Sequence, residues 1–374
     1  MPNCYVPWTN LDISPQGEMS PCCKFKHSVY STKVLNINSS TIDDYINSHT
    51  LKEVKKDFTE GRWPKGCERC KVEEDNGIES KRIQYQKLWS DYLAEDKGFI
   101  TASVAFGNTC NLTCITCDPS ASSKWYQEYK KLYGIEIKPN HFYKEGFVDN
   151  LLDNIPNLIH LDIPGGEPFL SGVPQQKELL RRLVDQGKSK NIGLHYMTNC
   201  TVYPDDEWFS LWSHFKRLEI QLSIDGLGSR FEYIRYPGKW EEVEQNLKKY
   251  IALRDQGKIV LNVSATVSAY SIPYLSELVE WCHDHDITTP FLGRVHNPSH
   301  LRPTVWRDDA KKFIIERLEQ SKHDLSPFVQ LMRSEDDSQH FETFRYRLLR
   351  HDMHRKLSFK NTFPEMIEFL VDKK

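Results

Sequence analysis

Three cysteines stand within eight residues, at Cys110, Cys114 and Cys117, and their spacing constrains this chain more than any other feature. They follow the run Phe99–Phe106, whose apolar and β-branched residues predict a strand that ends just before the loop. Three thiolates on one loop can bind a [4Fe–4S] cube and leave one iron without a protein ligand. A catalytic metal site needs such an open position, whereas a structural site avoids it. A structural zinc site is the alternative interpretation of the triplet.

The remaining cysteines are also clustered, because five of the ten precede residue 71 of this 374-residue chain. The N-terminus lacks the basic start and apolar stretch of a secretory signal. The clusters therefore indicate metal ligation in a reducing compartment, and we expect a cytoplasmic protein. No apolar run has transmembrane length, so no membrane association is expected. The formal net charge of −3 gives no electrostatic support for a nucleic-acid partner, although a local basic groove stays open.

From residue 98 onward the chain alternates apolar strand-like segments with helical patterns of about ten residues or more, which predicts an α/β fold with a parallel sheet. Six such units are too few for an eight-stranded barrel, and we expect a partial (β/α)6 TIM barrel over 98–300 with its active site at the carboxyl ends of the strands. The predicted strands are 99–106, 158–163, 192–198, 217–224, 259–267 and 290–295. The predicted helices are 120–132, 175–186, 205–214, 240–256 and 273–284.

The first 97 residues have a different pattern and predict a small α+β module. Residues 5–13 and 18–22 flank a Ser-Pro-Gln-Gly turn, which predicts a hairpin. Thr41, with Asp44 three residues later, predicts the start of a helix over 41–58. A further helix is expected from the Cys67-x2-Cys70 pair to residue 93. Residues 301–374 are polar and predict a helical C-terminal extension.

The three-cysteine loop resembles that of the radical S-adenosylmethionine superfamily. The resemblance implies that Cys110, Cys114 and Cys117 hold a catalytic [4Fe–4S] cluster whose open iron chelates S-adenosylmethionine. One electron then cleaves the cofactor to methionine and a 5′-deoxyadenosyl radical, which abstracts hydrogen from a substrate. One position departs from the family: relatives carry an aromatic residue just before the last cysteine, where this chain has Thr116. Adenine must then rest elsewhere, and residues 263–267 or 291–295 are candidates.

Further motifs of that family follow the predicted strands in the expected order. Gly165, Gly166 and Glu167 resemble its GGE motif, in which glycines admit the methionine part of the cofactor and the carboxylate accepts a hydrogen bond from its amino group. The other cofactor-binding candidates each match a strand-end or loop residue of relatives. They are Asn199, for the ribose or carboxylate, Ser223 and Asp225, for the ribose, and Arg235, for the carboxylate.

The N-terminal cysteines resemble the auxiliary-cluster modules called SPASM and twitch. Cys4, Cys22, Cys67 and Cys70 are the expected ligands of a second [4Fe–4S] cluster, closed by four thiolates. SPASM modules hold two clusters and need more cysteines, so twitch fits better, although such modules normally follow the core. Cys23 is an alternative to Cys22, and a four-cysteine zinc site is the alternative to iron and sulfur.

The function expected from the resemblance is a radical S-adenosylmethionine oxidoreductase with two [4Fe–4S] clusters. Its substrate is a small molecule or a peptide, its auxiliary cluster accepts the electron left on the substrate, and its reducing partner is a protein such as flavodoxin or ferredoxin. The alternative is a non-catalytic iron–sulfur or zinc protein for electron transfer or structure. An electron carrier has no use for the GGE or Ser-x-Asp-Gly strand ends. No motif in the sequence marks the catalytic residues that would face the substrate.

Overall fold

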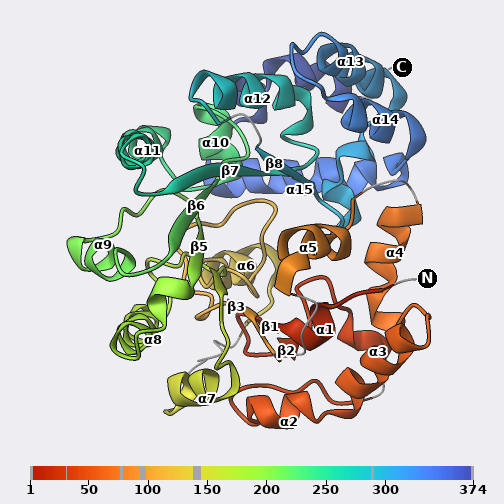
Figure 1. The fold of residues 1–374 in the computed structure, drawn as a ribbon. Coiled ribbons are helices and arrows are strands. Elements are labelled where there is room, and N and C mark those ends of the chain that lie inside the picture. Colours follow the sequence, from red (N-terminus) through yellow and green to blue (C-terminus); the bar gives the residue numbers. More distant parts are fainter. Residues whose placement is uncertain are drawn as a thin grey trace. The chain divides into compact units, whose positions relative to one another are not determined.

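The structure is a computed structural model that describes residues 3–30, 32–75, 79–92, 98–137, 145–287 and 290–371. The chain divides into two compact units. The first comprises residues 1–110, 139–196 and 204–218, and the second comprises 111–138, 197–203 and 219–374. Parallel strands and helices occur in both (Figure 1).

The first unit is built on strands in the order β2-β1-β3-β4-β5. The predicted hairpin is present in a shorter form, since β1 pairs antiparallel with β2 but residues 6–9 are helical and not part of the strand. β1 also pairs in parallel with β3. The parallel pairing then continues from β3 to β4 and from β4 to β5. The strand bounds are β1 Asn10–Ile13, β2 Met19–Ser20, β3 Thr101–Val104, β4 His160–Ile163 and β5 Gly193–Thr198, the last two residues of β5 belonging to the second unit.

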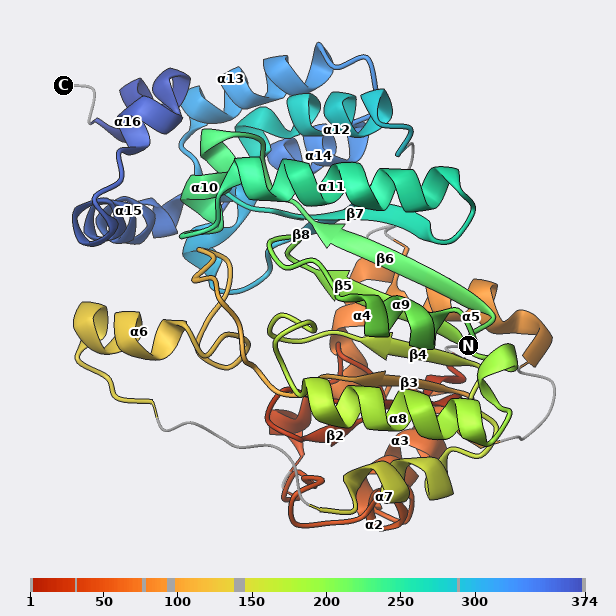
Figure 2. The ribbon, with the colours of Figure 1, turned by 90° about the vertical axis from the view of Figure 1, so that its left-hand side faces the viewer.

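Alternation along these strands gives the sheet of the first unit one apolar and one polar face. Leu161, Leu194 and Tyr196 are fully buried, and the Tyr196 ring contacts Trp208 and Trp212 of α9. Helices α7, α8 and α9 follow one another along the strands (Figures 1 and 2). The opposite face carries polar residues, among them Asp162 and His195, which pair in register on β4 and β5. The helices of this unit are α1 Val6–Thr9, α2 Ile42–Ile46, α3 His49–Thr59, α4 Glu68–Asp75, α5 Lys81–Trp89, α7 Phe147–Asn154, α8 Val173–Asp185 and α9 Asp206–Trp212.

Serine caps divide the long helices expected in the N-terminal region. Thr41 caps α2 in a capping box with Asp44, as its position predicts. The helix expected over 41–58 is nevertheless two helices, because Ser48 accepts a hydrogen bond from the Leu51 amide and starts α3. The helix expected from Cys67 to residue 93 is likewise divided into α4 and α5, and Ser80 caps α5. Residue 93 lies outside the described residues.

The second unit contains the parallel strands β6, β7 and β8, joined through helices as βα units. α10 and α11 follow β6, and α12 follows β7. The strand bounds are β6 Arg217–Ser223, of which the first two residues belong to the first unit, β7 Val260–Val267 and β8 Phe291–Arg294. The helices are α6 Trp125–Tyr133, α10 Ser229–Ile234, α11 Trp240–Asp255, α12 Leu275–Asp284, α13 Asp308–Glu319, α14 Ser326–Ser334, α15 Phe341–Arg355 and α16 Phe359–Thr362.

The prediction of an α/β fold with mainly parallel pairing is confirmed. All six strands expected between residues 98 and 300 are present, with ends that differ by no more than two residues. α6 starts at Trp125 rather than at residue 120, because residues 118–124 form turns. α7 and the short α10 were not expected. No helix within the described ranges is both long and apolar enough to cross a membrane.

Candidate metal centres

Backbone hydrogen bonds within the second unit hold the loop that carries Cys114 and Cys117. The Thr113 amide donates to the Tyr236 carbonyl at 2.6 Å, and the Ile115 amide donates to the Ile234 carbonyl at 2.8 Å. Cys114 is buried, whereas Cys117 is partly exposed. The loop therefore runs alongside the end of α10 and the residues that follow it, with one thiol inside and one near the surface.

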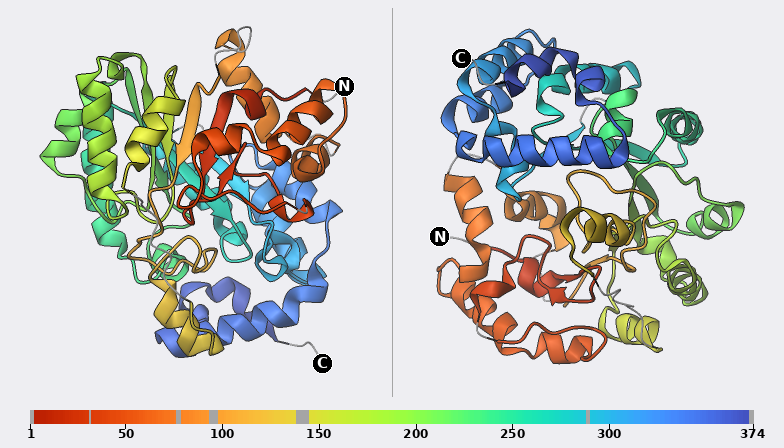
Figure 3. Two further views of the ribbon diagram at one scale, coloured as in Figure 1. Left: turned by 90° about the horizontal axis from the view of Figure 1, so that it is seen from below. Right: turned by 180° about the vertical axis from the view of Figure 1, so that it is seen from behind.

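Side chains from α6, the turn before it and α15 support the same loop. Ser122 Oγ donates to the Leu112 carbonyl at 2.6 Å, and Trp125 Nε1 donates to the Cys114 carbonyl at 3.2 Å. Arg355, at the end of α15, donates to the Thr113 carbonyl at 2.7 Å. Figure 3 shows α6 and α15 side by side.

Arg355 is a supporting residue that the sequence prediction missed. Its side chain has no exposed surface, and its Nε lies 2.6 Å from Glu128 Oε1 on α6. Its guanidinium also lies over the rings of Trp125 and Tyr236, with centroid distances of 5.1 and 5.0 Å. A buried ion pair of this kind holds its two elements in a fixed position, because breaking it would leave an unpaired charge in the interior. No local motif identifies Arg355, since its partners precede it by more than 200 residues.

Two of the predicted cofactor residues, Asp225 and Arg235, form a buried ion pair next to Cys114. Arg235 Nε lies 2.9 Å from Asp225 Oδ2, and Arg235 Nη1 lies 3.9 Å from Cys114 Sγ. Asp225 Oδ1 accepts a hydrogen bond from the Thr266 amide at 2.7 Å. Burial acts to lower the pKa of the Arg235 guanidinium, but the charges of Asp225 and Cys114 outweigh it and raise that pKa. A fixed positive charge thus stands beside one cysteine of the loop.

The side chain of Asn199 binds the residue that follows the first cysteine of the loop. Its Nδ2 donates to Asn111 Oδ1 at 3.0 Å, and its Oδ1 accepts from the Thr201 hydroxyl at 2.6 Å. Asn111 Nδ2 donates to the same hydroxyl at 2.8 Å, which closes a triangle of three side chains. Asn199 therefore anchors the loop through its carboxamide.

Ser223, another predicted cofactor residue, is the last residue of β6. It is half-buried and lies opposite Ser264 of β7.

The three residues of the GGE motif lie in the first unit, against the chain just before Cys110. Gly165 and Gly166 have φ values of +90° and +49°, which L side chains rarely adopt. A Cβ on Gly166 would lie 2.4 Å from the Thr109 carbonyl oxygen, so only glycine fits here. Glu167 is fully buried, and its amide donates to the same carbonyl at 2.8 Å. The motif is therefore fixed to the residue that precedes Cys110, itself the last residue of the first unit.

Three of the four predicted auxiliary cysteines lie in or against one apolar cluster of the first unit, and the fourth, Cys70, is buried in α4. Cys4 belongs to a buried cluster with Val54 and Phe58, and Cys22 and Cys67 pack against that cluster. Burial raises the pKa of the Cys4 thiol to about 12 and raises those of Cys22 and Cys67 as well. Neighbouring cysteines add to this effect: Cys70 acts on Cys4 and Cys67, and Cys4 acts on Cys22.

Cys23 faces a different environment from that of its neighbour. Burial raises the pKa of the Cys23 thiol, and the charged groups that then act on it are Asp12, Lys81, Lys24 and Asp162. Burial and Cys23 raise the pKa of the Cys22 thiol most, and Cys67 and Cys4 raise it further. The arrangement favours Cys22 as the member of the four-cysteine set.

Charged residues border this cysteine region on one side. Arg82 donates to both carboxylate oxygens of Glu74, at 2.8 and 2.6 Å, and to the Asn3 carbonyl at 2.5 Å. Its charge also lowers the pKa of Cys4 against the larger effect of burial. Arg82 thus ties the chain before Cys4 to helices α4 and α5. No local motif in the sequence identifies this role.

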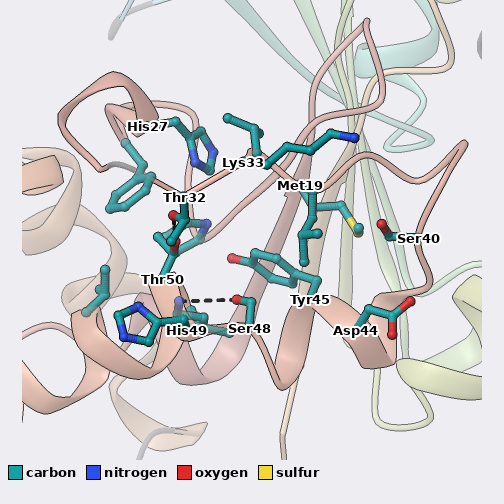
Figure 4. Close-up of a pocket in the computed structure, with 16 residues that line it drawn as sticks. Met19, His27, Thr32, Lys33, Ser40, Asp44, Tyr45, Ser48, His49 and Thr50 are labelled. Carbon is teal, nitrogen blue, oxygen red and sulfur yellow. Dashed lines mark hydrogen bonds between the residues drawn. The ribbon is translucent and has the colours of Figure 1, made fainter.

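A cavity of about 490 Å³ lies in the same N-terminal region, between the 32–40 loop and helices α2 and α3 (Figure 4). Phe25 and Val54 line it and also pack in or against the apolar cluster that contains Cys4. Tyr45 and Ser48 border it from α2 and the start of α3. No cysteine is among its lining residues, so the cavity borders the cysteine region without being part of it.

Comparison with protein families identifies the N-terminal region. Residues 4–71 match the SPASM family, described as an iron–sulfur cluster-binding domain. This stretch of the chain is similar to SPASM domains. The match spans Cys4, Cys22, Cys67 and Cys70, and it confirms the predicted relation of the N-terminal cysteines to iron–sulfur modules of this type.

Solved structures with similar folds include three proteins. The chain is 17% identical to anSMEcpe, solved with bound AdoMet, with 61% of this chain and 62% of that chain covered and a TM-score of 0.45. TYW1 with a lysine-pyruvate adduct is 14% identical, with 59% of this chain and 74% of that chain covered and a TM-score of 0.35. Streptococcus suis SuiB bound to S-adenosylmethionine is also 14% identical, with 87% of this chain and 68% of that chain covered and a TM-score of 0.36. The chain thus spans less than two thirds of anSMEcpe. A comparison with curated proteins found no match.

Proposed function

We propose that this chain is a radical S-adenosylmethionine oxidoreductase. The observation that carries the proposal is the loop at Cys114, where Arg235 places a charge 3.9 Å from the Cys114 sulfur within a buried ion pair. A thiolate cluster is anionic, and a fixed guanidinium beside it offsets that charge and offers bidentate bonds to a carboxylate. A purely structural zinc knuckle requires neither this charge nor the GGE strand end.

The proposed site uses two sets of residues, the cysteines that bind the cluster and the residues that bind the cofactor. Cys110, Cys114 and Cys117 are the proposed ligands of the catalytic [4Fe–4S] cluster. When bound, this cluster supplies the electron that cleaves S-adenosylmethionine to methionine and a 5′-deoxyadenosyl radical. The donor set fits the group, because three thiolates leave one iron for the cofactor.

The cofactor-binding residues have distinct proposed tasks. Gly165 and Gly166 keep a surface free of side chains, and Glu167 accepts a hydrogen bond from the cofactor's amino group. Arg235 orients the carboxylate of the cofactor, with Asp225 holding the guanidinium in place. Asn199 positions the loop, and its carboxamide is also proposed to form a hydrogen bond with the ribose or the carboxylate of the cofactor. Ser223 and Asp225, at the end of β6, are proposed to face the ribose.

The domain assignment follows from the same proposal. Residues 1–97 form a twitch-like auxiliary module, 98–300 form the radical core as a partial (β/α)6 barrel, and 301–374 form a helical extension. In the auxiliary module, Cys4, Cys22, Cys67 and Cys70 close a second [4Fe–4S] cluster. Four thiolates leave no open iron, which suits an electron acceptor rather than a substrate-binding site. The SPASM match over 4–71 supports an iron–sulfur role for this region.

The substrate is a small molecule or a peptide that loses hydrogen to the 5′-deoxyadenosyl radical. Oxidation of the substrate radical then releases one further electron, which the auxiliary cluster accepts. A low-potential carrier such as flavodoxin or ferredoxin supplies the electron that starts each turnover. A cytoplasmic location is proposed as well, because a reducing compartment keeps the thiols of both cysteine sets out of disulfides.

The decisive experiment is an anaerobic assay for 5′-deoxyadenosine with dithionite and S-adenosylmethionine. The wild-type protein forms it, and the variant with Cys110, Cys114 and Cys117 all changed to Ala forms none while it keeps the auxiliary iron. Cys282→Ala, which removes a cysteine outside both sets, serves as the matched control and retains activity. Formation of 5′-deoxyadenosine by the triple variant, or zinc in place of iron in the wild type, would contradict the proposal.

A further inference from the structure

Three side chains on the polar face of the first unit form a compact group that the radical chemistry does not use. Within the described residues, they are the group of His, Cys, Asp and Glu side chains whose potential ligand atoms all lie within 4.8 Å of one another. The group consists of His160 and Asp162 on β4 and His195 on β5. No three cysteines of either set within the described residues meet this distance.

The pleat of the sheet determines that these side chains point the same way. His160 and Asp162 are two residues apart on one strand, so they share a face. Asp162 stands directly opposite His195 in the parallel register between β4 and β5, which places the imidazole on that face too. The grouping therefore depends on regular strands rather than on loops, and such positions are well fixed.

The distances are close to those between ligands of one metal ion. Asp162 Oδ1 lies 3.1 Å from His160 Nε2 and 2.7 Å from His195 Nδ1. Ligand atoms bound tetrahedrally at about 2.0–2.2 Å from a zinc ion lie roughly 3.3–3.6 Å from each other, a few tenths of an ångström or more beyond these hydrogen-bond distances. The three atoms therefore need only small movements to coordinate one cation.

The surroundings make room for the His160 ring and restrain it. Its register partner on β5 is Gly193, and a Cβ there would lie 3.3 Å from His160 Nδ1. On another side, the Trp89 ring of α5 lies 5.1 Å from the His160 ring, measured between centroids. A glycine opposite and an aromatic ring alongside leave His160 Nε2 directed at Asp162.

A row of polar residues continues across the same face. Asp12 of β1 pairs in register with Ser103 of β3, which pairs with Asp162 of β4. Asp12, Ser103, Asp162 and His195 thus stand side by side on four neighbouring strands. Asp12 also accepts a hydrogen bond from Ser20 at 3.4 Å. This row offers polar side chains that can form hydrogen bonds with a water molecule or ligand bound to the metal.

We propose that His160, Asp162 and His195 bind a first-row divalent cation such as Zn²⁺, Fe²⁺ or Mn²⁺. Two imidazoles and one carboxylate suit such ions, whereas an all-oxygen set would suit Mg²⁺ or Ca²⁺. Three protein ligands leave at least one position for water or for an oxygen or nitrogen atom of a ligand, as in catalytic zinc sites. The inference does not depend on the radical chemistry, because none of these residues belongs to either cysteine set.

The test is an anaerobic titration of the cluster-loaded, desalted protein with Mn²⁺, followed by EPR of the free ion. Oxidised [4Fe–4S] clusters have no unpaired spin, so the manganese signal is read without interference. The wild-type protein removes about one Mn²⁺ per chain from the free pool, and added Zn²⁺ displaces it. The His160→Gln/His195→Gln double variant loses this binding, as does the nearly isosteric Asp162→Asn. His214→Gln, which changes an exposed histidine of the same unit, binds as the wild type does.

A second, milder variant tests the geometry without removing a ligand. Gly193→Ala presses a methyl group on the His160 ring, and its Mn²⁺ affinity falls roughly tenfold. Iron content and 5′-deoxyadenosine formation are measured in every variant, so that failure of the metal site is distinguished from failure of the radical chemistry. Equal retention of Mn²⁺ by the wild type and by the Asp162→Asn and double variants would overturn the proposal and leave the trio as a hydrogen-bonded group only.

Discussion

The two cysteine sites of this chain have opposite surroundings. Cys114 lies beside a buried Asp225–Arg235 ion pair, with a guanidinium nitrogen 3.9 Å from its sulfur. Cys4 lies among apolar side chains, where burial raises the pKa of its thiol to about 12. A charged environment stabilises an anionic cluster and can bind a charged cofactor, whereas an apolar one excludes both water and ligands. The difference agrees with the proposal that the loop with Cys114 exchanges ligands and the N-terminal site remains closed.

The same contrast bears on assembly. A thiol whose pKa is raised by burial becomes a thiolate ligand only when a metal displaces its proton. We therefore expect cluster binding in the N-terminal region to be coupled to its folding more tightly than at the three-cysteine loop, where Arg235 supplies a compensating positive charge.

The largest effect is expected when the auxiliary cysteines are removed together. Changing Cys4, Cys22, Cys67 and Cys70 to Ala should lower the iron content by about four atoms per chain, the content of one cube. Cleavage of S-adenosylmethionine without substrate should persist, since the three-cysteine loop supplies its own ligands. Iron analysis and the 5′-deoxyadenosine assay measure both outcomes, after solubility has been checked. An unchanged iron content would remove the auxiliary cluster from the proposal.

The adjacent cysteines sharpen the comparison, because their thiols face different groups. Cys22→Ala should lose most of the auxiliary iron, whereas Cys23→Ala should retain it. The two variants differ by one position and remove the same atoms, so each is the control for the other. Iron content and the visible absorption of the cluster provide the measurement. Iron loss in Cys23→Ala alone would exchange the two assignments.

Removal of the charge beside Cys114 should weaken cofactor binding without loss of iron. A hydrogen bond to a charged group contributes roughly 1.5–3 kcal/mol, so Arg235→Ala and Glu167→Ala should each weaken S-adenosylmethionine binding about ten- to a hundredfold. Arg230→Ala removes another ion-paired arginine of α10 and serves as the control. Equilibrium binding of S-adenosylmethionine to cluster-loaded protein is measured. Unchanged affinity in both variants would place these residues outside the cofactor site.

The smallest effect concerns acid stability near the three-cysteine loop. Burial first, and then the charges of Arg355 and Arg347, lower the pKa of His351 to about 3, below its usual value of about 6.5. The folded state therefore binds fewer protons than the unfolded state, and stability present above pH 6.5 is lost as the pH falls. The expected loss is about 1.4 kcal/mol per pH unit below 6.

His351→Phe should flatten this dependence, whereas the exposed His354→Gln should not. Thermal unfolding at pH 7.5 and 5.5 under anaerobic conditions measures the difference. An equal pH dependence in wild type and His351→Phe would show that another group governs acid stability in this unit.

The strands were predictable because their pattern is local. Segments such as 192–198 and 217–224 alternate or concentrate apolar residues over five to eight positions, and turn residues bound them. The relation of the N-terminal cysteines to an iron–sulfur module was also predictable, because cysteines that are clustered in a chain without a secretory signal indicate metal ligation. The divided helices were missed because Ser48 and Ser80 compete with a weak amphipathic pattern by capping new helices.

Other features could not be predicted, because they depend on strand register or on distant contacts. His160 and Asp162 form an unremarkable His-x-Asp on one strand, and only the pairing of β4 with β5 brings His195 to them. Arg355 is one of several basic residues in a polar helix, and nothing in its neighbourhood marks it as the support of Thr113. The cofactor-binding residues and the domain bounds stay predictions.

The link between Arg355 and the cysteine loop has a consequence for the order of events during protein synthesis. A ribosome makes the chain from its N-terminus, and a nascent chain that has reached only residue 300 already contains all ten cysteines. It still lacks the arginine that binds Thr113 and Glu128. The loop therefore acquires its final support only after α15 has emerged from the ribosome. Insertion of iron and sulfur at this loop is thus expected to be completed after translation. A chain that ends at a premature stop before residue 355 should contain all of the cysteine ligands and lack the arginine that supports the loop.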